Sequence, residues 1–190
     1  GKQARSFCLR VLVAALPALA VGYVFNDAIE RWTRHAGFVA VDLAFWALVL
    51  FAADRSSRST KQSSPLMDVT WKQAIVVGLS PPIALLPGTS RSGITMTAGL
   101  LTGLSREAAA RFSFFVSIPV IAAAGGYGLL KMVKHGTGGD GMIALGVGFI
   151  SAALVGAWAI RFLISYVSKR RFDAFVYYRM ALALVVLLFV

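Results

Sequence analysis

The chain has 190 residues, of which 58% are hydrophobic and 14% charged, and its mean hydropathy is +0.75. This composition excludes an ordinary water-soluble domain, which could not bury so many apolar side chains, so lipid is the expected solvent for much of the chain. The net charge of +11 does not indicate nucleic-acid binding, because the basic residues stand at the ends of apolar tracts, as lipid-headgroup anchors do.

Five apolar tracts approach the length that a helix needs to cross the hydrocarbon layer. They cover about residues 7–25, 37–53, 108–133, 142–163 and 174–190. Polar, basic or glycine-rich segments separate them, and Pro17 predicts a kink in the first. We therefore expect an all-α, polytopic transmembrane helical bundle that forms a single membrane domain over residues 1–190.

The segment from about residue 71 to 105 has a different pattern. Its apolar residues are interrupted by Gly78, Pro81 and Pro82 and then by the polar run PGTSRSG at residues 87–93. Neither half is long enough to span a bilayer. The pattern of helix, irregular turn and helix predicts a re-entrant hairpin that enters the membrane and returns to the same side.

The polar run is expensive in a membrane unless a ligand uses it. A phosphate would account for each part, since glycines let backbone amides approach its oxygens, hydroxyls donate hydrogen bonds and a guanidinium can hold two oxygens. The amides that open the following helix add positive charge. The predicted phosphate loop therefore consists of residues 88–93 with Thr95 and Thr97, and its phosphate-binding members are Gly88, Thr89, Ser92 and Gly93 beside Ser90 and Arg91.

Two plainer interpretations apply to polar residues of this kind. Serine and threonine often bond back to helical carbonyls, and an arginine can extend to the headgroups, although this suits one residue better than six.

Asp42 and Asp140 are far apart and form no ligand-spaced cluster, so we expect solvated or helix-end roles for them. With one cysteine, Cys8, and two histidines, the residues predict no metal site of their own.

Residues 84–95 (ALLPGTSRSGIT) and 99–119 (GLLTGLSREAAARFSFFVSIP) closely resemble the bacterial undecaprenyl-diphosphate phosphatase family, also called bacitracin-resistance proteins. The resemblance extends more weakly over nearly all of the chain. It implies a multi-pass enzyme of the bacterial inner membrane that hydrolyses undecaprenyl diphosphate to undecaprenyl phosphate and inorganic phosphate. This reaction recycles the carrier lipid of peptidoglycan synthesis and confers bacitracin resistance.

The resemblance also assigns roles to residues. It implies that Ser90, Arg91 and Thr95 are the catalytic phosphate-contacting residues, with Ser92 and the loop amides in support. It implies two re-entrant hairpins at one active site, and a divalent cation, Mg²⁺ or Ca²⁺, as cofactor. The expected partners are a polyprenyl diphosphate lipid and the bilayer, and a homodimer is left open.

The chain departs from the family pattern in two places. Pro81 stands where the family usually has a glutamine, and the family's earlier hairpin, rich in glutamate with serine and histidine, has no match before residue 35. The chain thus resembles the C-terminal part of a family member, and Ser90 has no visible base in the sequence. The alternatives are a lipid-phosphate transporter or flippase, since broken helices at an anion site are also typical of transporters, or an inactive fragment.

Arg91 is the only cation in the loop, and its guanidinium stays charged at any working pH. Arg91→Lys keeps the charge but loses the two-pronged donor, so in a complete enzyme we expect a loss of roughly 3 to 4 kcal/mol in transition-state stabilisation. Ser92→Ala should be milder, because loop amides can replace one hydroxyl. Turnover of the two variants in detergent tests whether Arg91→Lys loses more activity than Ser92→Ala. Near-normal turnover of Arg91→Lys would identify this arginine as a headgroup anchor.

Overall fold

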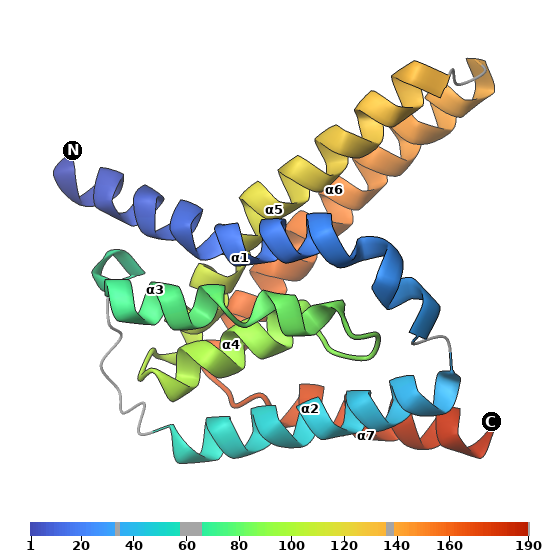
Figure 1. The fold of residues 1–190 in the computed structure, drawn as a ribbon. Helices are drawn as coiled ribbons and strands as arrows, with labels where there is room; N and C mark the ends of the chain where they lie inside the picture. The colour runs from blue at the N-terminus through green and yellow to red at the C-terminus, as the bar shows by residue number, and fades with distance from the viewer. Residues whose placement is uncertain (33–34, 58–65, 136–138, 190) are drawn as a thin grey trace.

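The computed structural model describes residues 1–32, 35–57, 66–135 and 139–189, and over these residues the chain is helical, without strands (Figure 1). This confirms the predicted all-α class. The helices are α1 (Lys2–Trp32), α2 (Ala36–Ser56), η1 (Leu66–Asp68), α3 (Trp71–Gly78), η2 (Pro81–Leu85), α4 (Arg91–Leu101), α5 (Arg106–His135), α6 (Gly139–Val167) and α7 (Asp173–Leu188).

Four helices of the described residues are long and apolar enough to cross a membrane, within α1, α2, α5 and α6. The expected fifth span, at residues 174–190, is not among them. Its helix α7 has 16 residues, and at about 1.5 Å per residue it falls short of the roughly 30 Å hydrocarbon layer. It instead packs along α2, in the opposite direction (Figure 1).

The segment predicted as a hairpin consists of two short helices joined by irregular chain. Thr70 and Gln73 form a reciprocal capping box that starts α3, and α3 ends at Gly78 before the two prolines of η2. A Cβ on Gly78 would lie 2.6 Å from the Cα and carbonyl oxygen of Ala14, so only glycine allows α3 to lie this close to α1. That the hairpin enters a bilayer and returns stays a prediction.

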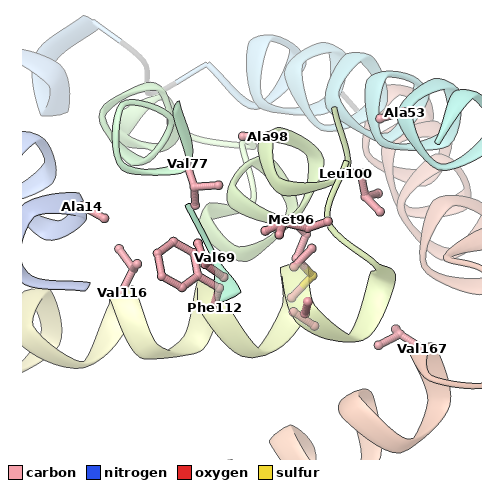
Figure 2. Close-up of a cluster of buried hydrophobic side chains, with 14 of the residues drawn as sticks. Ala14, Ala53, Val69, Val77, Met96, Ala98, Leu100, Phe112, Val116 and Val167 are labelled. Atoms are coloured by element: carbon pink, nitrogen blue, oxygen red, sulfur yellow. The ribbon is translucent and has the colours of Figure 1, made fainter. Parts of the chain in front are cut away.

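Helix α4 is the central element of the packed region. Every residue from Ile94 to Leu100 is buried, and the surrounding contacts come from α2, α3, η2 and α5. Figure 2 shows Met96 and Leu100 among the buried side chains of this core, with Phe112 and Val116 of α5 and Val77 of α3. The first residues of α4 therefore have a fixed position relative to α2 and α5.

Helices α5 and α6 extend side by side away from this core (Figure 1). None of the most apolar stretch of α6 is buried inside the protein. Large side chains such as Phe149 and Trp158 are 74% and 68% exposed on it. A surface so apolar is suited to lipid, which agrees with the multi-pass membrane protein predicted from the sequence.

One buried ion pair joins three parts of the core. Asp54, near the end of α2, is 2% exposed, and its Oδ1 accepts a hydrogen bond from Arg106 Nε, the first residue of α5, at 2.5 Å. Its Oδ2 accepts from the backbone N–H of Phe172, just before α7, at 3.4 Å. A single carboxylate thus fixes the end of α2 against the starts of α5 and α7.

We expect Asp54→Asn to destabilise the fold by about 3 kcal/mol, because it leaves the partly buried Arg106 without its counter-charge. Asp173→Asn is the matched control, since Asp173 pairs with Arg55 at 3.5 Å on the surface, where such pairs contribute about 1 kcal/mol or less. Unfolding in detergent, followed by circular dichroism, measures both. Equal losses of unfolding free energy in the two variants would show that the buried Asp54 pair stabilises the fold no more than the surface pair does.

Candidate phosphate site at the start of α4

The loop before α4 makes a tight turn against α2. Gly88 has φ of +103°, a left-handed conformation that side-chain-bearing residues rarely adopt. A Cβ there would also lie 2.5 Å from the carbonyl oxygen of Val39 in α2. Both constraints require glycine at this position. Because the turn lies this close to α2, Thr89 and Ser90 lie beside that helix.

Ser90 begins α4 as its N-cap. Its Oγ accepts a hydrogen bond from the backbone N–H of Gly93 at 3.2 Å and lies 3.4 Å from Ser92 Oγ. The first amides of a helix carry partial positive charge and point away from its body. Two hydroxyls and these amides therefore face the same region, which is an arrangement suited to an anion.

Arg179 of α7 reaches the same loop. Its Nη2 donates to the carbonyl oxygen of Gly88 at 3.1 Å, and its Nη1 would lie 3.1 Å from a Cβ on Gly93. The residue is 8% exposed, and its Nε has no hydrogen-bond partner among the described residues. A buried guanidinium with a free donor is costly, and an anionic ligand at the loop would satisfy it.

Sequence reasoning missed Arg179 as a site residue. It is the single charged residue within the aliphatic tract after residue 173, which was a usable signal because ionisable residues in such tracts are often functional. What the sequence could not show is that this tract packs on α2 and returns to the loop.

The expectation that Asp42 is a solvated or helix-end residue is wrong. It lies within α2, and its Oδ2 accepts a hydrogen bond from Thr89 Oγ1 at 2.6 Å. The same hydrogen bond involves Thr89, which was predicted to bind phosphate. Thr89 is 9% exposed and donates its hydroxyl proton to Asp42, so that proton is committed within the protein.

A cavity of about 320 Å³ opens beside Ser90 and Arg179. One part of its lining is polar and is formed by Ser90, Ser92, Gly93 and Arg179, which lie close together. The remaining wall is mostly apolar and is formed by Leu43, Leu50, Met96, Leu163, Phe172, Phe175 and Tyr178. This combination fits an amphiphile that has an anionic head and a hydrocarbon chain.

The other two residues to which catalytic roles were given lie apart from this cavity. Arg91 is the first residue of α4, and its side chain is exposed, outside the cavity lining. Thr95 is 2% exposed, and its hydroxyl meets Ser113 of α5 and the carbonyl oxygen of Arg91. The structure thus brings Ser90, Ser92 and Gly93 to the cavity and places Thr95 in the contact between α4 and α5.

The described residues form no divalent-cation site of their own. No three of their His, Cys, Asp and Glu side chains are grouped. The nearest carboxylate to the loop, Asp42, already accepts the Thr89 hydrogen bond. No step of a reaction is therefore assigned to a cation.

Comparison with known proteins places this geometry in context. Residues 1–185 match the family described as bacitracin resistance protein BacA. The chain is 42% identical over 176 residues to an undecaprenyl-diphosphatase of Rubrobacter xylanophilus, covering 93% of this chain and 64% of that protein. It is 41% identical to a Caldicellulosiruptor bescii relative of the same name, covering 94% of this chain and 66% of the relative, and 39% identical to one of Thermodesulfovibrio yellowstonii, with 97% and 69% covered.

The chain thus spans about two thirds of the length of these curated relatives. The family match covers nearly every residue, including the loop before α4 and the helix that carries Arg179. By this match the chain belongs to the bacitracin resistance protein BacA family.

Proposed function

We propose that this protein is a membrane phosphatase that hydrolyses undecaprenyl diphosphate to undecaprenyl phosphate and inorganic phosphate. The observation that carries the proposal is the amphiphilic cavity, in which the free Nε donor of buried Arg179 adjoins the hydroxyls of Ser90 and Ser92. The name of these relatives, undecaprenyl-diphosphatase, supports the substrate. The same proposal places the chain in the bacterial inner membrane.

In this proposal the loop binds the terminal phosphate. The guanidinium of Arg179, the hydroxyls of Ser90 and Ser92 and the first amides of α4 hold its oxygens and stabilise the charge that develops as water displaces the lipid phosphate. Among the described residues no carboxylate or imidazole is hydrogen-bonded to Ser90 Oγ. We therefore assign Ser90 to phosphate binding rather than to nucleophilic attack.

The apolar wall explains how a lipid could be accommodated. Phe172 and Phe175, whose ring centroids are 6.3 Å apart, line the cavity together with Leu43 and Leu50 of α2. The first isoprene units of a polyprenyl chain would lie along these side chains while the diphosphate reaches the loop. A divalent cation and the pairing of two copies stay predictions.

The assignment is tested by adding undecaprenyl diphosphate to the protein in liposomes and measuring phosphate release and lipid movement between leaflets together. Release of one phosphate per lipid is the expected result. Lipid movement without phosphate release would replace the enzyme with a transporter. If neither phosphate release nor lipid movement were detected, the alternative of an inactive fragment would be supported.

Arg179→Gln should reduce turnover by about a hundredfold, because a typical electrostatic donor in an active site contributes roughly 3 kcal/mol to transition-state stabilisation. Arg179→Lys should be intermediate, since it keeps the charge but loses the planar donor set. Arg161→Gln is the matched control, because Arg161 is an exposed arginine on α6. If Arg179→Gln turned over as fast as Arg161→Gln, the arginine would be structural and the proposed phosphate contact would be withdrawn.

A further inference from the structure

Asp42 is a carboxylate placed well inside a helix that is long and apolar enough to span the membrane. It lies in the second turn of α2 and is half-buried. A charged side chain within such a segment is costly, so it usually has a partner and a function. Asp42 is also the one carboxylate that is hydrogen-bonded to the run of residues 87–93, among the residues that the structure describes.

The side chain of Asp42 is hydrogen-bonded to the phosphate loop. Its Oδ2 accepts the hydrogen bond from Thr89 Oγ1 at 2.6 Å, which is short for a protein hydrogen bond and typical of a hydroxyl that donates to a charged oxygen. The same Oδ2 would lie 3.2 Å from a Cβ on Gly88. The carboxylate therefore packs directly against the turn that leads into Ser90.

Arg179 holds the same turn from α7. It donates to the carbonyl oxygen of Gly88, while Asp42 accepts from the next residue, Thr89. The turn is thus fixed by one negative and one positive side chain from two different helices. Ser90, which caps α4 and lines the cavity, follows immediately, so any movement of Thr89 would move it as well.

The carboxylate has an electrostatic effect besides this mechanical one. A phosphate bound at Ser90 and Arg179 would lie close to Asp42, and like charges repel strongly where water is scarce. An anion-binding loop without a nearby negative charge would bind inorganic phosphate more tightly. With Asp42 behind the loop, part of the attraction from Arg179 and the α4 amides is offset.

We propose that Asp42 is a positioning residue that fixes Thr89, and with it Ser90, and whose negative charge weakens the hold of the loop on inorganic phosphate so that the product leaves. This inference rests on the proposed function, because it takes the loop to bind a phosphate. It assigns to Asp42 no contact with the reacting atoms.

The charge is tested with Asp42→Asn, which keeps an oxygen acceptor for Thr89 but removes the negative charge. We expect inorganic phosphate, titrated into the detergent-solubilised protein by calorimetry, to bind about tenfold more tightly, with an unchanged thermal unfolding midpoint. Phosphate should also become a stronger inhibitor of lipid hydrolysis. Asp68→Asn is the matched control, since Asp68 lies in η1 and bonds Gln3, outside the cavity lining.

The hydrogen bond is tested separately with Thr89→Val, which keeps the charge and removes the donor. We expect phosphate to bind about fivefold more weakly and turnover to fall, because the turn loosens and the carboxylate loses its partner. In the Asp42→Asn background, Thr89→Val should weaken phosphate binding by about twofold or less, since the two residues act through one hydrogen bond. Thr102→Val, which removes a hydroxyl bonded to Gly99 at the far end of α4, is the control.

These outcomes separate the inference from the function on which it rests. Phosphate calorimetry needs no turnover, so a protein that binds phosphate with the expected variant pattern but releases none from the lipid would fail only as a phosphatase. A protein that hydrolyses the lipid, yet binds phosphate no more tightly as Asp42→Asn than as Asp68→Asn, would overturn only the role of Asp42. Full additivity of Asp42→Asn and Thr89→Val would also overturn it.

Discussion

The arrangement of the site depends on the buried pair of Asp54 and Arg106. The carboxylate accepts hydrogen bonds from the first residue of α5 and from the backbone just before α7, so the end of α2 and the starts of two later helices meet at one side chain. From this junction α2 and α7 run alongside each other (Figure 1). Because the two helices lie side by side in opposite directions, Asp42 and Arg179 both reach the same turn. A buried charge pair of this kind adds little net stability compared with apolar packing, but removing one partner leaves the other charge buried and uncompensated.

The phosphate loop is held from three sides, and none of the supports is local in sequence. Helix α2 provides Asp42 and the backbone that Gly88 touches, α7 provides Arg179, and α5 provides Ser113 against Thr95. The polar groups that the loop must bury are thereby largely satisfied by other polar groups, as burial requires. The guanidinium Nε is the exception, and it lies in a residue that lines the cavity.

Much of the fold was predictable from the sequence because the patterns that encode it are local. Long apolar tracts predicted the spanning helices, while Gly78 and the two prolines predicted the interruption between α3 and α4. The motif at residues 87–93 indicated the loop for the same reason. The partners of that loop were not predictable: 47 residues separate Asp42 from Thr89, and 91 separate Gly88 from Arg179. Helical periodicity gives the face of a helix, but it does not identify the helix that packs on it. Hydropathy predicted a span at residues 174–190, but not that its helix α7 has 16 residues.

The cavity beside the loop has an apolar wall formed by side chains from α2 and α7, which bears on how a lipid would be supplied to it. A polyprenyl chain loses about 0.8 kcal/mol for each CH₂ that leaves the hydrocarbon, so it remains dissolved in the bilayer while its head is bound. The lipid would then meet the protein by lateral diffusion in the plane of the bilayer. The variable that governs occupancy is the mole fraction of substrate in the membrane, and diluting the membrane with inert lipid would lower the rate even at a fixed total amount of substrate.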